Sequence, residues 1–109
     1  MVLLTHIRQK KIPTNIEIHM YLHHGHGAAK NEHGPPHVHV VYTPQGGFES
    51  RIFIADLKVE PVDGERSIKD STVLKYAKKW IVKHRKELLK KFEEAMNGIE
   101  PEKMDGAIP

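Results

Sequence analysis

The stretch 70–97 contains neither glycine nor proline, the two residues that most often interrupt a helix. Its apolar side chains recur at helical spacings and therefore share one face. They are Leu74, Ala77, Ile81, Leu88, Phe92 and Met96. Asp70 is among the credible N-terminal caps, and Asn97-Gly98 is a suitable stop. The pattern predicts one long helix over about 70–97, with room for a bend near His84.

The part of the chain before this helix has a different period. Apolar and polar side chains alternate there in short runs, which is typical of strands with one buried face. The connections between the runs are too short for parallel crossovers, so neighbouring strands should be antiparallel. The runs are residues 16–22, 36–42, 48–54 and 57–62. The sequence therefore predicts an α+β fold, with an antiparallel sheet of about four strands packed on one long C-terminal helix.

A length of 109 residues suits a single domain, 1–109. We expect its core over about 14–98, followed by a loosely held tail over 99–109. No apolar run is long enough to span a bilayer, and the start of the chain lacks the pattern of a secretory signal. The absence of cysteine excludes disulfides, thiolate zinc sites and a thiol nucleophile. These features predict a cytoplasmic protein with no membrane contact.

The densest group of chemically active side chains lies in residues 32–39. Imidazole suits proton transfer near neutral pH and is the commonest metal ligand in proteins. His37 and His39 are two residues apart on a predicted strand, so both rings should leave the same face, close enough to hold an ion or a phosphate. The preceding Pro-Pro fixes the backbone, and Glu32 and His33 could fold back over the pair. The alternative is that these histidines are surface residues beside a braced loop.

A second histidine group, His23, His24 and His26, falls in a glycine-rich loop. Chance affinity for metals is one interpretation of this group. The other is that it adds ligands to the His37–His39 pair.

Positive charge is concentrated on the predicted helix. Residues 67–97 carry nine basic and four acidic side chains, whereas residues 1–66 are balanced. Five lysines spaced four, four, three and four apart should line one side of the helix, with Arg85 at the edge of the apolar face. They are Lys75, Lys79, Lys83, Lys86 and Lys90. This stripe is either a solvated face or a docking surface for nucleic acid or an acidic protein.

The run 31–40, Asn-Glu-His-Gly-Pro-Pro-His-Val-His-Val, resembles the signature of a small bacterial family catalogued as domain of unknown function 4160. The segment 80–88 is similar to its second hallmark, and Asn97-Gly98 resembles its ending. The resemblance covers roughly residues 14–104. Two departures are an apparent insertion at 23–30 and Phe92, where the family often has a second tryptophan. The resemblance implies a cytoplasmic protein encoded beside a short partner and suspected to be half of a toxin–antitoxin pair.

Three functions follow from these observations as hypotheses. The first is a toxin-like member of a two-gene module that binds nucleic acid, such as RNA, and cleaves or modifies it without a cofactor. His37, His39, His33 and Glu32 are its candidate catalytic residues; the lysine stripe and Arg85 would bind nucleic acid or a small acidic antitoxin-like partner. The second is a module that binds zinc or a similar divalent ion through His37, His39 and His33. The third is a non-catalytic protein-interaction domain.

Overall fold

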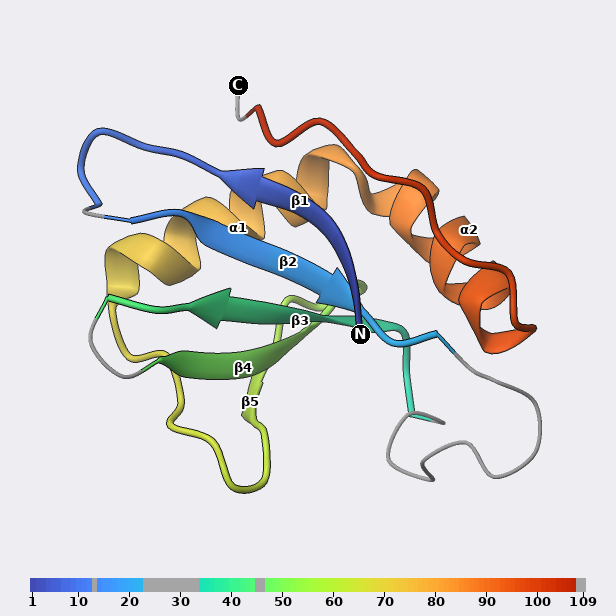
Figure 1. Cartoon of the computed structure of the whole chain (residues 1–109), viewed down its shortest axis with the longest axis horizontal. Helices are drawn as coiled ribbons and strands as arrows, with labels where there is room; N and C mark the ends of the chain where they lie inside the picture. Colours follow the sequence, from blue (N-terminus) through green and yellow to red (C-terminus); the bar gives the residue numbers. More distant parts are fainter. Residues whose placement is uncertain (13, 23–33, 45–46, 108–109) are drawn as a thin grey trace.

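The computed structural model places a single antiparallel sheet and two helices within the described residues, which are 1–12, 14–22, 34–44 and 47–107 (Figure 1). The strands follow one another in space as they do in sequence, each antiparallel to its neighbour. They are β1 (Val2–Ile7), β2 (Ile16–Met20), β3 (His37–Tyr42), β4 (Phe48–Phe53) and β5 (Val59–Pro61), and the helices are α1 (Ser71–Lys83) and α2 (Arg85–Met96). The α+β class and the antiparallel sheet are confirmed.

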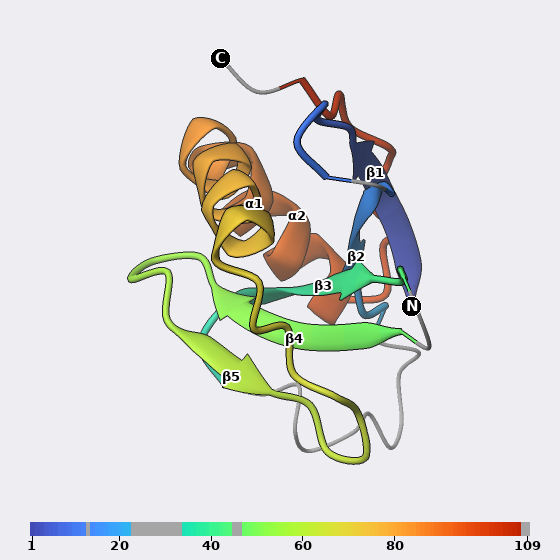
Figure 2. The same cartoon turned by 90° about the vertical axis from the view of Figure 1, so that its left-hand side faces the viewer.

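The core lies between one face of the sheet and the helices. Figure 2 shows both helices on the same side of the curved sheet. On β2, Ile16, Ile18 and Met20 are fully buried, and the residues between them are only partly buried. Trp80 and Ile81 of α1 belong to the same buried cluster as these side chains. The period-two alternation of the strands therefore separates a core face from a second face of the sheet.

β1 is the strand that the sequence did not predict, so the estimate of about four strands was one too few. It pairs with β2, and Leu4 and Ile7 are fully buried. The register between the two strands shifts between Leu3 and Thr5, which marks an irregularity of the bulge type. Such a shift disrupts the alternation of apolar and polar residues, and Thr5 is buried beside Leu4. The period-two pattern is therefore weak in this strand.

The helical run was predicted as one long helix with room for a bend near His84, and the structure breaks it at that residue into two helices. Asp70 caps α1 as expected, its side chain accepting bonds from the backbone of Thr72 and Val73. The break needs neither glycine nor proline. Nε of Arg85 donates to the carbonyl of Ile54, 2.9 Å away, which ties the start of α2 to the residue after β4. Tertiary contacts of this kind override helix propensity.

The segment after α2, which the sequence analysis expected to be a loosely held tail, makes several contacts with the rest of the chain. The amide of Met104 donates to the carbonyl of Leu4 at 2.8 Å, beside the outer edge of the sheet. The indole N–H of Trp80 donates to the carbonyl of Asp105 at 2.8 Å. A side chain at Gly106 would collide with the carbonyl of His6, so the backbones approach too closely for any other residue. These contacts anchor the described part of this segment to β1 and α1.

Among the described residues, neither helix is long and apolar enough to cross a membrane.

Candidate functional site

The second face of the sheet carries most of the polar residues of β2, β3 and β4. We call it the histidine face and define it by Glu17, His19, His37, His39, Glu49 and Arg51. Strand alternation places these side chains opposite the core residues that neighbour them in sequence, for example Ile18 and Val38.

A row of three basic side chains crosses the centre of this face. In the strand register His19 of β2 is opposite His39 of β3, and His39 is opposite Arg51 of β4. Side chains opposite one another on antiparallel strands have their Cβ atoms about 4.5–5.5 Å apart. The next row holds Glu17 and Glu49 on either side of Val41. Two imidazoles and a guanidinium thus lie side by side, bordered by two carboxylates.

His39 is held by an ionic hydrogen bond and by aromatic contacts. Its Nδ1 lies 3.0 Å from Oε2 of Glu49, and the ring is 2% exposed. The ring of Tyr21 packs edge-on at 4.7 Å between centroids. When Nδ1–H donates to a carboxylate, the neutral ring carries its basic lone pair on Nε2. A carboxylate that sets the tautomer and orientation of an imidazole in this way is a common feature of acid–base sites.

His19 forms a second imidazole–carboxylate pair on the neighbouring strand. Its Nε2 lies 2.8 Å from Oε1 of Glu17, and the two side chains are 15% and 33% exposed. This pair is therefore more accessible than the His39–Glu49 pair.

Arg51 contributes a cation whose hydrogen bonds are incomplete. One terminal nitrogen, Nη2, donates to the carbonyl of Pro61 at 3.1 Å, which holds the guanidinium over β5. The buried Nε of Arg51 and the buried Nδ1 of His19 have no hydrogen-bond partner within the part of the chain that the structure describes. Buried polar atoms without partners are uncommon in proteins and call for an explanation. An anion over the row could accept from the Arg51 N–H.

His37 contacts different groups from those around His39, although the two rings are neighbours. Their centroids are 5.3 Å apart, as expected for side chains two apart on one strand. Nδ1 of His37 lies 2.9 Å from the carbonyl of Pro35, and its ring packs near Phe53 and Phe92. His37 is 2% exposed. The ring of His37 therefore contacts the Pro-Pro segment, β4 and α2.

Glu32 and His33 lie outside the described residues, as do His23, His24 and His26. Within the described residues, no group of three or more histidines and carboxylates has the geometry to hold a metal ion. The zinc interpretation depends on His33 or on the His23–His26 loop, and it stays a hypothesis.

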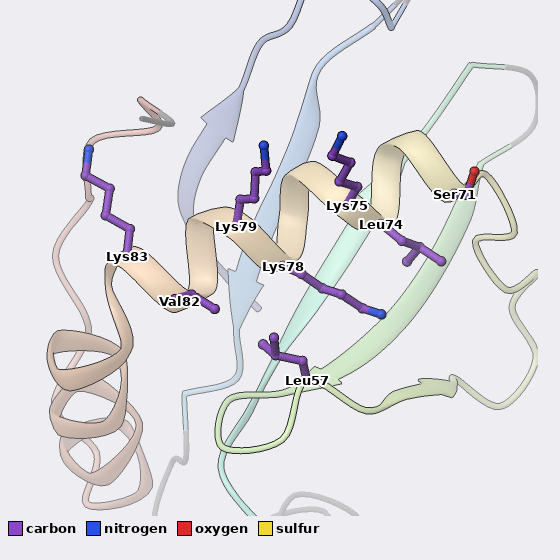
Figure 3. A pocket seen from close by; sticks show the side chains of 8 residues that line it. All are labelled: Leu57, Ser71, Leu74, Lys75, Lys78, Lys79, Val82 and Lys83. Atoms are coloured by element: carbon purple, nitrogen blue, oxygen red, sulfur yellow. The ribbon is translucent and has the colours of Figure 1, made fainter.

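The lysine stripe is divided by the break at His84. Lys75, Lys79 and Lys83 project from α1 (Figure 3), whereas Lys86 and Lys90 belong to α2, which runs in another direction (Figure 1). Since α1 packs against the core face of the sheet, its exposed lysines lie on the other side of the molecule from the histidine face. Arg85 uses Nε to bind the backbone of Ile54 and has a structural role.

His84 packs against Trp80, at 4.7 Å between ring centroids. Burial lowers the pKa of His84 below its ordinary value, and the charge of Lys83 lowers it further, against smaller opposing effects of Glu87 and Asp105. The half-buried ring is therefore kept neutral near physiological pH, and its environment is that of a packed structural residue.

The sequence reasoning missed Glu49 and Arg51. Both alternate with the buried Ser50 and Ile52 on β4, so their orientation was predictable from the strand pattern. Their proximity to His39 was not, because it depends on the register between β3 and β4.

A comparison with known protein families finds a match that includes the histidine face. A family model described as Domain of unknown function (DUF4160) matches residues 15–93. The chain belongs to this family. The matched part of the DUF4160 chain includes the histidine face and all of α1. No curated protein and no solved structure matches the chain.

Proposed function

We propose that this DUF4160 chain is the toxin-like member of a two-protein module in the cytoplasm, and that it binds RNA at the histidine face. The observation that supports the proposal is the row His19–His39–Arg51, in which a buried guanidinium N–H lacks an acceptor within the described residues. A phosphate oxygen is a strong acceptor with the charge that a guanidinium prefers. The proposed partner is a small acidic antitoxin-like protein that neutralises the lysine stripe.

The same row carries the groups that metal-free RNA cleavage needs. In that reaction the 2′-oxygen attacks phosphorus while a base removes its proton. The bond from phosphorus to the 5′-oxygen breaks, and an acid protonates this leaving oxygen. His39, oriented by Glu49, is the candidate base, and His19 is the candidate acid on the adjacent strand. Arg51 lies where it can stabilise the charge that develops on the phosphate.

The two carboxylates of the histidine face affect the binding of a phosphate through their negative charge. Arg51 carries one positive charge, whereas Glu17 and Glu49 carry two negative charges. The two carboxylates therefore oppose the binding of an RNA phosphate at this face, and Arg51 is the group that offsets them.

A non-catalytic interaction domain is the second candidate. It is favoured by the burial of His37 and His39, each 2% exposed and packed among aromatic rings. In this alternative the histidines are a polar part of the core, and His19 and Arg51 only contribute to the surface.

The test is RNA binding and cleavage with single substitutions in the row. Fluorescence anisotropy would measure the affinity for a labelled single-stranded RNA, and single-turnover assays would measure cleavage. Arg51→Gln should weaken binding by about tenfold or more, because a charged phosphate contact is lost. His39→Asn should abolish cleavage and retain most of the binding. Lys86→Gln removes the same charge from α2 and should have little effect.

Growth arrest provides the cellular readout. Expression of the chain alone should slow growth, and His39→Asn should relieve the effect at equal protein levels. If Arg51→Gln and His39→Asn are folded and behave like the wild type in both assays, the histidine face is not the site and the interaction domain is the better assignment.

A further inference from the structure

A groove runs between α1 and the turn that connects β4 to β5 (Figure 3), and its lining shares no residue with the histidine face. Its volume is about 800 Å³, and most of its surface is apolar, contributed by Leu57, Leu74, Val82 and the aliphatic stems of the lysines. Leu57 forms one wall, and Leu74 and Val82 project from α1 on the other side. Val82 is 50% exposed, which is high for a valine in a protein with a formed core.

Lysines border this apolar floor. Lys75, Lys78, Lys79 and Lys83 are among its lining residues; in Figure 3 Lys78 extends toward Leu57, whereas Lys75, Lys79 and Lys83 extend from the opposite side of α1. Within the described residues none of these lysines forms an ion pair, and Lys83 contacts only a backbone carbonyl, that of Ala107. Four positive charges on one helix repel one another. An acidic ligand would convert this repulsion into attraction.

The wall at Leu57 has an unusual backbone. Leu57 has φ = 63° and is the one residue other than glycine with a positive φ in the described part of the chain. This conformation is unfavourable for a leucine. The turn is fixed by a bond from the amide of Leu57 to the carbonyl of Phe53, and it directs the leucine side chain across the groove toward α1. Strained residues of this kind are concentrated at functional surfaces.

We propose that this groove binds an acidic amphipathic helix of a partner protein. The lining of α1 extends from Ser71 to Lys83, which is about 18 Å and corresponds to about three turns of a helix. Leu74 and Val82 are separated by about two turns, so apolar residues seven or eight apart on the ligand would reach both. Glutamates or aspartates on its two flanks would meet the lysines.

The lining favours a protein helix over nucleic acid. Nucleic acids bind basic surfaces through phosphates and commonly stack their bases on aromatic side chains. Among the described residues, the lining includes no aromatic side chain, and its apolar groups are aliphatic. Because the groove and the histidine face are on different sides of the molecule, this inference does not depend on RNA binding.

The probe for this groove is a synthetic, fluorescein-labelled peptide of about four turns, with leucines at i, i+4, i+7 and i+11 and mostly glutamates elsewhere. Its binding to the full chain is measured by anisotropy. Three other ligands serve as controls: a scrambled peptide of equal composition, an oligoglutamate of equal charge, and a single-stranded RNA. The patterned peptide should bind at least about tenfold more tightly than any of them, because only it presents an apolar stripe and acidic flanks together.

Two variants locate the binding. Val82→Glu places a carboxylate on the exposed apolar floor and should weaken peptide binding about tenfold or more. Lys75→Gln with Lys79→Gln should weaken it and reduce its salt dependence. The matched control, Lys86→Gln with Lys90→Gln, removes equal charge from α2 and should change the affinity less than about twofold. Circular dichroism checks that each variant is folded.

Several results would overturn the proposal. If oligoglutamate or the scrambled peptide binds as tightly as the patterned peptide, charge alone accounts for the binding. Preference for RNA, lost in the Lys75–Lys79 double variant, would assign the surface to nucleic acid. Sedimentation showing a dimer that Val82→Glu dissociates would assign it to a second copy of the chain. Loss of RNA binding at the histidine face would leave this inference unaffected.

Discussion

The bond between His39 and Glu49 allows a quantitative prediction. Nδ1 and Oε2 are 3.0 Å apart, and the side chains are 2% and 14% exposed. Replacing Glu49 with methionine keeps much of the side-chain length but removes the carboxylate that lies 3.0 Å from Nδ1 of His39. Removing one partner of a buried hydrogen bond costs about 1–3 kcal/mol. Partial exposure of the carboxylate argues for the middle of this range, so we expect Glu49→Met to destabilise the fold by about 2 kcal/mol.

This change should be visible in the melting temperature. An unfolding entropy of about 2.1 cal/mol/K per residue gives a chain of this length a shift of about 4.4 °C per kcal/mol, so Glu49→Met should lower Tm by about 9 °C. Glu49→Gln retains an oxygen acceptor and should cost less than about half as much. As a control, Glu17→Met removes the partner of the more exposed His19 and should cost less than about 1 kcal/mol.

A double-mutant cycle separates the bond from other effects of the substitution. His39→Phe retains a ring at the contact with Tyr21 and removes the donor. Urea unfolding of the two single variants, the double variant and the wild type should give a coupling energy of about 1–2 kcal/mol. A coupling below about 0.3 kcal/mol, which is within the usual error of additivity, would refute the argument that Glu49 holds His39.

Two further predictions concern the core. Ser50 is fully buried and its Oγ accepts from the amide of Ile68 at 2.9 Å, so Ser50→Ala should cost about 1–2 kcal/mol in urea unfolding by leaving that amide unsatisfied; an unchanged midpoint would contradict this role. Because burial lowers the folded-state pKa of His84 below its ordinary 6.5, the stability due to the neutral ring is present above pH 6.5 and is lost as pH falls through the lower folded value. His84→Gln should flatten the pH dependence in this acidic window. In the wild type, the fluorescence of the single tryptophan, Trp80, should be quenched by protonated His84 with a midpoint below 6.5, and a higher midpoint would contradict the burial argument.

Local periodicity was sufficient to predict most of the fold. The alternation in residues 16–22 and 36–42 predicted β2 and β3, and the helical spacing after Asp70 predicted where α1 begins. The pattern failed where a distant contact decides the local structure. The break at His84 accompanies the bond between Arg85 and the backbone of Ile54, and β1 depends on pairing with β2 across an irregular register.

The site was predicted less completely for a related reason. Spacing alone placed the rings of His37 and His39 next to each other. Spacing could not show that the two rings have different partners. Glu49 of β4 contacts His39, whereas the carbonyl of Pro35 contacts His37. The lysine pattern on α1 was visible in the sequence, but the apolar groove beside it was not. Leu57 reaches this groove only because the β4–β5 turn brings it close to α1.

The most direct test of RNA binding at the histidine face is an NMR titration of the ¹⁵N-labelled chain with a short single-stranded RNA. Amide and side-chain resonances report which surface the RNA contacts. The account predicts that the largest shifts occur at His19, His39, Glu49 and Arg51. Shifts confined to Lys75, Lys79 and their neighbours on α1, or the absence of saturable shifts, would contradict it.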